Sequence, residues 1–101
     1  MLNNKPLISI CIPTYHRAKY LQEAIDSALN QTYSNYEIIV VSDGFDKETD
    51  DLIYGYSNTK IKYFKKTHTN SPDTRNRSIK ESKGEYILWL DDDDLLDENI
   101  L

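Results

Sequence analysis

Short apolar runs alternate with longer amphipathic stretches along the whole chain. Residues 7–12, 36–41 and 85–90 are apolar almost throughout, which is typical of strands buried on both faces of a sheet. Residues 59–64 alternate between apolar and polar side chains and predict a shorter strand. We therefore expect four strands, and the stretches between them are long enough for helices.

Three helices are predicted between these strands. Residues 19–31 and 48–57 carry apolar side chains at helical spacing. A third helix is expected from residue 72 to about residue 83, ahead of Gly84, because glycine commonly ends helices. The resulting β-α-β-α-β-α-β order is typical of a Rossmann-like α/β fold. Such a fold has a mostly parallel sheet with helices on both faces, here in a single domain over residues 1–101.

Four consecutive carboxylates, residues 91–94, directly follow the last predicted strand. Ligands of open α/β sheets lie beyond the carboxyl ends of the strands, so these acids stand where a ligand is expected. Adjacent carboxylates repel one another unless a cation neutralises them, and divalent cations prefer oxygen ligands. The segment predicts a metal site for a phosphate-bearing substrate. One alternative stays open, in which residues 95–101 begin a helix, Asp94 is its N-cap and the other acids are only solvated.

The negative charge of the chain is concentrated in this segment. The 101 residues carry a formal net charge of −5, from 12 basic and 17 acidic side chains. All 12 bases and 11 of the acids lie in residues 1–90, whereas residues 91–101 hold six acids and no base. The rest of the chain is nearly neutral and lacks the basic footprint that nucleic acids require. We therefore expect no nucleic-acid partner.

Cysteine content and hydropathy set further limits. Cys11 is the one cysteine, which excludes an internal disulfide and a cysteine-based zinc site, and its place within a strand predicts a buried thiol. The sequence shows neither an N-terminal signal pattern nor an apolar run of membrane-spanning length. We therefore expect a cytoplasmic protein without a transmembrane segment.

The common phosphate-binding loops do not occur in the sequence. The first strand-to-helix loop, residues 13–17, has no glycine, whereas a dinucleotide fingerprint requires several, and the P-loop triplet Gly-Lys-Ser/Thr is missing. Leucines after the acids exclude an EF-hand. A nucleotide on this sheet would need side chains and a metal. The predicted strand ends offer Tyr15, Asp43 and residues 91–93 for that purpose.

Five segments together resemble the N-terminal half of a family 2 glycosyltransferase with the GT-A fold. They are ISICIPTYHR at residues 8–17, LNQTY at 29–33, IIVVSDG at 38–44, Arg75-Asn76, and GEYI at 84–87 followed by the acids in the place of the family's DXD motif. The match covers essentially the whole chain in the family's order and spacing. The resemblance implies metal-dependent transfer of a sugar, with inversion. The donor would be a nucleotide diphosphate sugar, expected to be a UDP-sugar, and the acceptor a hydroxyl of a carbohydrate or glycolipid.

The resemblance also implies site residues. Asp93 matches the ligand of a divalent cation, Mn²⁺ or Mg²⁺, that bridges the donor diphosphate and offsets charge on the departing nucleotide. The expected nucleotide-binding residues are Asp91 and Asp92 near the ribose, Asp43 at the uracil, Tyr15 against the base, Pro13 and Thr14 through their backbone, and Arg17 and Arg75. Simpler alternatives stay open: Asp43 as a turn residue, Tyr15 as a partly buried tyrosine, and Arg75 as a surface arginine, which for Arg17 alone is the favoured interpretation. Trp89 is expected in the core and not as a platform for the sugar.

The chain departs from the family pattern at several positions. The family commonly has Asn, Asp and Ser where this chain has His16, Ser42 and Phe45. The loop before Arg75 reads TNSP at residues 69–72, in place of paired glycines. Proline makes this loop stiffer, and we expect that to affect donor preference.

Catalytic domains of this family run roughly twice the length of this chain. The missing half supplies the acceptor pocket and the general base, so the base is expected beyond residue 101. We expect the isolated chain to transfer little or no sugar. Two other hypotheses stay open: a truncated module that binds nucleotide and metal, and an α/β interaction domain. The last strand is expected to leave a sheet edge exposed, which predicts a homodimer or aggregation.

Overall fold

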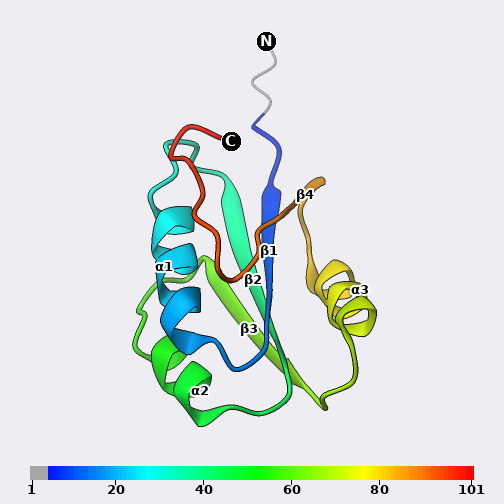
Figure 1. Ribbon diagram of the computed structural model, residues 1–101. Helices are drawn as coiled ribbons and strands as arrows, with labels where there is room; N and C mark the ends of the chain where they lie inside the picture. The colour runs from blue at the N-terminus through cyan, green and yellow to red at the C-terminus, as the bar shows by residue number, and fades with distance from the viewer. Residues whose placement is uncertain (1–4) are drawn as a thin grey trace.

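The computed structural model describes residues 5–101 and contains the predicted strands and helices in the predicted order (Figure 1). They are β1 (Ile8–Thr14), α1 (Ala18–Leu29), β2 (Tyr36–Asp43), α2 (Lys47–Tyr54), β3 (Ile61–Lys66), α3 (Ser71–Glu81) and β4 (Tyr86–Trp89). The ends of these elements differ from the predicted ends by a few residues. Among the helices of this part of the chain, none is long and apolar enough to cross a bilayer.

The strands run parallel in one sheet, in the order β3-β2-β1-β4. α1 and α2 cover one face of the sheet, and α3 covers the other (Figure 1). The first two crossovers proceed in one direction from β1, and the third returns past β1 to place β4 on its far side. The predicted Rossmann-like α/β fold is confirmed. The reversal between β1 and β4 creates the switch point at which open α/β sheets bind ligands.

Apolar side chains fill two unequal layers. The larger layer lies between the sheet and helices α1 and α2, and its buried members include Ile10, Ile12, Leu21, Ala24, Ile25, Ala28, Ile38, Val40 and Ile53. The smaller layer lies on the α3 face and consists of Cys11, Ile39 and Val41. β2 is buried along its whole length, as expected of an inner strand covered on both faces. The Cys11 thiol is buried as predicted, and burial raises its pKa, so it stays protonated at neutral pH.

β1 runs two residues further than predicted, through Pro13 to Thr14. Proline lacks a backbone donor and normally interrupts an inner strand. Cys11 faces β4, since its carbonyl accepts a hydrogen bond from Leu90 N–H at 3.0 Å. Pro13, two residues on, faces the same side, beyond the end of β4 at Trp89. No strand of the described residues lies beside Pro13 to require the backbone N–H that proline lacks. β1 can therefore continue to Thr14 at the carboxyl edge of the sheet.

A buried polar network fixes β4 against β1. Ser9 Oγ donates to Glu37 Oε2 at 2.6 Å and accepts from Gly84 N–H at 2.8 Å. Lys83 N–H donates to the same Glu37 oxygen at 2.7 Å. Ser9 and Glu37 are buried, so water cannot replace these bonds. The Gly84 amide is thus the point at which the chain entering β4 meets β1.

The alternative helix from residue 95 is absent, and Asp94 is therefore not a helix N-cap. After β4 the chain crosses to the α1 side of the sheet and runs along that helix (Figure 1). Its backbone bonds to the residues that follow α1: Gln31 Nε2 donates to Asp97 O at 2.7 Å, and Thr32 N–H donates to Glu98 O at 3.0 Å. These tertiary partners satisfy backbone groups that a helix would have satisfied internally.

Trp89 lies outside the core, contrary to the expectation from the sequence. It is the last residue of β4, and its side chain is 38% exposed. Within residues 5–101, β4 pairs with β1 alone, so its other edge is open. The predicted exposed edge is present in this part of the chain, and association through that edge stays a prediction.

Candidate functional site

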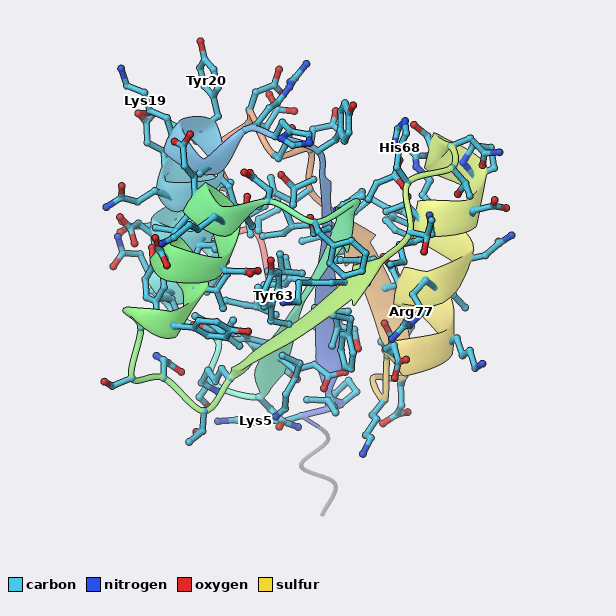
Figure 2. The ribbon with its side chains drawn as sticks, turned by 90° about the horizontal axis from the view of Figure 1, so that it is seen from below. Lys5, Lys19, Tyr20, Tyr63, His68 and Arg77 are labelled. Carbon is cyan, nitrogen blue, oxygen red and sulfur yellow. The ribbon has the colours of Figure 1, made fainter. Side chains whose placement is uncertain are left out.

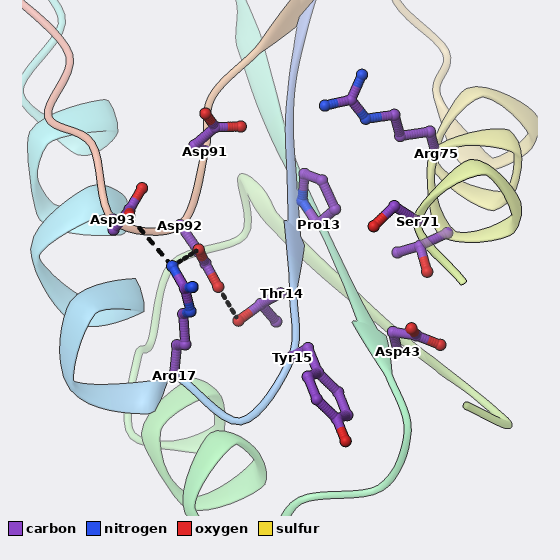
Figure 3. A pocket seen from close by; sticks show the side chains of 11 residues that line it. Pro13, Thr14, Tyr15, Arg17, Asp43, Ser71, Arg75, Asp91, Asp92 and Asp93 are labelled. Atoms are coloured by element: carbon purple, nitrogen blue, oxygen red, sulfur yellow. Dashed lines mark hydrogen bonds and ion pairs between the residues drawn. The ribbon is translucent and has the colours of Figure 1, made fainter. Parts of the chain in front are cut away.

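The carboxyl ends of β1, β2 and β4 and the first turn of α3 surround an open pocket of about 390 Å³ (Figure 3). The pocket is lined by Pro13, Thr14, Tyr15, Arg17, Asp43, Ser71, Thr74, Arg75, Asp91, Asp92 and Asp93. Every residue predicted to bind nucleotide or metal lies on this one surface. Parallel strands bring their carboxyl ends to the same edge, so residues far apart in sequence converge there.

Asp92 joins the end of β1 to the segment that follows β4. Its Oδ2 accepts a hydrogen bond from the Thr14 hydroxyl at 2.9 Å (Figure 3). Asp92 is only 8% exposed. Burial raises the pKa of its carboxyl above the ordinary value, although the Thr14 hydroxyl and the charge of Arg17 oppose that rise. Asp92 therefore points inward and holds the two strand ends together.

The other three acids form a turn at the surface. Asp94 N–H donates to Asp91 O at 3.0 Å, which folds the run back on itself. One carboxylate oxygen from each of Asp91, Asp93 and Asp94 lies within 4.8 Å of the others, and all three residues are exposed. Carboxylate oxygens are the donors that Mg²⁺ and Mn²⁺ favour, so the donor set fits the expected cation. Asp94, for which a helix N-cap was the alternative, belongs to this group.

Arg17 faces the acidic turn from the start of α1. Its Nη1 lies 3.1 Å from Asp93 Oδ2 and 3.4 Å from Asp92 Oδ1 (Figure 3). The side chain is half-exposed, so solvent weakens these ion pairs. Arg17 is a surface arginine, as the alternative had it, and its guanidinium also contacts two of the predicted site acids.

The Asp43 carboxylate, at the end of β2, accepts three hydrogen bonds. Lys66 Nζ and Thr69 N–H both donate to Oδ1 at 2.9 Å, and His68 Nδ1 lies 3.1 Å from Oδ2. Because an ionised carboxylate only accepts, Nδ1 is the donor in the last bond. Burial alone would raise the pKa of Asp43, but the bonds from Lys66 and Thr69 and the nearby positive charge outweigh it and lower the pKa. Asp43 is therefore ionised and anchored, and it is more than a turn residue.

Asp43→Asn is expected to destabilise the protein at neutral pH and to reduce its sensitivity to acid. The folded-state pKa of Asp43 lies below the unfolded value of about 4, so the carboxylate stabilises the fold fully above that pH. This contribution is lost as the pH falls through the folded-state pKa. Thermal unfolding of both proteins from about pH 7 to about pH 3 should show a difference in melting temperature that narrows toward acid. A difference that stays constant over this range would contradict the expectation.

Tyr15 presents a half-exposed ring beside Asp43 (Figure 3). One face of this ring is stacked against His68, with centroids 4.5 Å apart and planes inclined by 17°. His16 meets Tyr15 edge-on, with centroids 4.6 Å apart at 87°. The backbone of His16 has φ of 50°, a left-handed conformation that Asn adopts more readily than most residues.

Arg75 is the second arginine of the pocket and comes from the first turn of α3. The Asn70 side chain accepts from Asp73 N–H at 2.9 Å and caps this helix. The Arg75 guanidinium lies 5.5 Å from the centre of the Trp89 ring, within the range of a cation–π contact.

Sequence analysis missed several residues around the pocket. They are Lys66, Ser71 and Thr74. Helical spacing would have found Ser71 and Thr74, since Ser71 lies four positions before Arg75 and three before Thr74, on one side of the helix. No local pattern marks Lys66, because the strand was expected to end at residue 64.

The chain is similar in sequence and in fold to known proteins. The pattern of glycosyl transferase family 2 matches residues 9–101. An uncharacterized glycosyltransferase of Rickettsia typhi is 51% identical over 90 residues, which are 89% of this chain and 28% of that protein. Staphylococcus aureus TarS (residues 1–349), solved in complex with UDP-GlcNAc, superposes with a TM-score of 0.83 at 29% identity, over 90% of this chain and 28% of TarS.

A third protein shares the fold at lower identity. The mannosyltransferase PcManGT of Pyrobaculum calidifontis, solved with GDP-Man and Mn²⁺, superposes with a TM-score of 0.82 at 20% identity, over 92% of this chain and 29% of that one. The chain thus spans less than a third of the length of each of these proteins. Because the family pattern covers nearly all of its residues, this chain belongs to glycosyl transferase family 2 and has the Rossmann-like GT-A fold.

Proposed function

We propose that this chain binds the donor of a metal-dependent sugar transfer. The donor is a nucleotide diphosphate sugar, and the cation is Mn²⁺ or Mg²⁺. The observation that carries the proposal is the composition of the pocket: an exposed aromatic ring, an anchored carboxylate, two arginines and an acidic turn line one surface. The ring and the carboxylate match the base of such a ligand, the arginines match its diphosphate, and the acidic turn matches the cation.

The base end of the donor lies at Tyr15 and Asp43 in this proposal. A planar base gains stacking energy on an exposed aromatic ring. The ionised Asp43 carboxylate only accepts hydrogen bonds, so it favours a base that presents a ring N–H, as uracil does. Guanine also presents a ring N–H, so the UDP-sugar that we propose as donor rests on the similarity to TarS, which was solved with UDP-GlcNAc.

The diphosphate end lies between the arginines and the acids. Arg75 and Arg17 supply guanidinium groups that match phosphate oxygens in shape and charge. Asp93 would bind the cation, with Asp91 and Asp94 as further oxygen ligands, while the inward-facing Asp92 lies nearer the ribose. A cation held there would offset the negative charge that develops on the departing nucleoside diphosphate.

The rest of the reaction needs residues outside this chain. Inverting transfer to an acceptor hydroxyl requires a general base, and we assign none here, since Asp94 belongs to the proposed cation ligands. The acceptor, a carbohydrate or a glycolipid, would bind residues that this chain does not contain. We therefore propose that the isolated chain binds donor and metal and transfers little or no sugar. Robust metal-dependent transfer by the isolated chain would contradict this part of the proposal.

Calorimetric titration of UDP into the protein, with and without Mn²⁺, tests the proposal. Binding should be tighter with Mn²⁺ by about tenfold or more, because a cation between two sets of anionic oxygens should contribute at least the ~1.4 kcal/mol that a tenfold change in affinity requires. Titration with uridine provides a control, since it lacks the diphosphate and should show no metal dependence. If UDP does not bind under either condition, the proposed function is wrong, and an interaction domain becomes the better hypothesis.

A further inference from the structure

His68 is a residue of the pocket's rim that the proposed function leaves without a role. It lies in the loop between β3 and α3, beside the start of that helix (Figure 2). We propose that the His68 imidazole occupies the place of the nucleobase in the ligand-free protein, so that it must leave before a donor binds. This inference rests on the proposed function, since it concerns the same base site.

The contacts of the imidazole match those that a base would make. A base bound here would lie flat against Tyr15 and donate a ring N–H to Asp43. The His68 ring does both, with its plane inclined by 17° to Tyr15 at a centroid distance of 4.5 Å and its Nδ1 at 3.1 Å from Asp43 Oδ2. A second ring cannot enter between two rings that already touch. A base on this face of Tyr15 therefore competes with the His68 ring for the stacking position, and it would bond the same oxygen of Asp43.

The arrangement of donors on Asp43 strengthens this competition. Lys66 Nζ and Thr69 N–H both bond Oδ1, which leaves Oδ2 as the oxygen for a ligand. His68 holds Oδ2. When the imidazole leaves, Lys66 still pairs with the carboxylate, so no buried charge is left unpaired. Asp43 can exchange one N–H donor for another without losing its anchor.

The His68 ring can move while its loop stays in place. Its side chain is 54% exposed, so solvent is available to the ring when it rotates away. The backbone on both sides is tied down, because Lys66 Nζ donates to Thr67 O at 2.8 Å and Thr69 N–H donates to Asp43. Rotation of the side chain is therefore enough, and the loop need not unfold. This rotation breaks one stacked pair and one hydrogen bond.

Titration of UDP with Mn²⁺ into the wild type, His68→Ala and His16→Ala tests the inference. Removing the competing ring should tighten UDP binding by about tenfold, the combined worth of one aromatic stack and one net hydrogen bond. His16→Ala is the matched control: it removes the other imidazole that contacts Tyr15, which has no bond to Asp43, and should change the affinity by less than about twofold. Melting curves of the three proteins establish that each is folded.

The outcomes separate the inference from the proposed function. Tighter binding by His68→Ala alone supports the inference. Equal or weaker binding by this variant overturns it, since weaker binding would make His68 a wall of the site. If none of the three proteins binds UDP, the proposed function fails and the inference falls with it. An NMR titration of the wild type gives a second readout: the His68 ring protons should lose the ring-current shift from Tyr15 as UDP is added, and an unchanged shift at saturation overturns the inference.

Discussion

Replacing Asp93 with alanine is expected to abolish the metal-dependent part of UDP binding. Asp93 contributes an oxygen to the exposed acidic turn and is the proposed ligand of the cation. Loss of residues that only orient metal ligands typically weakens metal binding by roughly 10- to 100-fold, so loss of a ligand should weaken it by about 100-fold or more. In calorimetric titrations, the affinity of the variant for UDP should be the same with and without Mn²⁺.

The Asp93→Ala experiment has two controls. Uridine affinity should not change, since the base site at Tyr15 and Asp43 does not contact Asp93. Glu98→Ala removes an acidic side chain close in sequence that lies outside the pocket, so this variant should keep the metal dependence of the wild type. If Asp93→Ala keeps a full metal response, Asp93 is not the cation ligand, and the acidic turn must bind through other residues or not at all.

Gly84→Ala is expected to destabilise the fold by about 3 kcal/mol or more. A Cβ at this position would lie 2.5 Å from Ser9 Oγ, 2.7 Å from Ser9 N and 2.8 Å from Leu7 O. Two of these atoms are backbone atoms: Ser9 N lies in β1, and Leu7 O directly precedes this strand. β1 is an inner strand and cannot move aside without breaking its pairing with β2. The added methyl would also separate the Gly84 amide from Ser9 and disturb the buried Glu37 carboxylate.

Gly55→Ala is the matched control for this substitution. Gly55 follows α2 with φ of −77°, and a Cβ there would meet its nearest neighbours at ordinary distances of 3.4 and 3.5 Å. This variant should change the stability by less than about 1 kcal/mol. Urea unfolding of both variants and the wild type measures the difference. If Gly84→Ala proves as stable as Gly55→Ala, the contact between Gly84 and β1 does not fix β4 as described.

The fold and the convergence of the site could be predicted from local patterns. The uninterrupted apolar run of β2 indicated a strand covered on both faces, and the structure buries it fully. Alternation of strands and helices implied a parallel sheet, and a parallel sheet brings the residues after each strand to one edge. That is why Tyr15, Asp43 and Asp92, each following or ending a different strand, could be placed near one another from the sequence.

The features that were predicted wrongly from the sequence depend on contacts with residues that are distant in the chain. The C-terminal segment has acids followed by leucines, which locally favour a helix start, but Gln31 bonds its backbone from 66 residues away. Trp89 belongs to an apolar run, which locally favours burial, but it ends a strand that pairs with β1 alone within the described residues, and its side chain is partly exposed. β3 extends to Lys66 because Asp43 pairs with Lys66 in the sheet register. The sequence of one short segment contains no information about these distant contacts.

The C-terminal segment has a consequence for how the acidic turn meets a cation. β4 enters the turn from one side, and the contacts of Gln31 and Thr32 with the segment after it hold the other side. The turn is thus a short loop closed at both ends, and most of its conformational entropy has already been lost when the chain folds. A cation that binds there need not order the backbone first, so more of its interaction with the carboxylates appears as affinity.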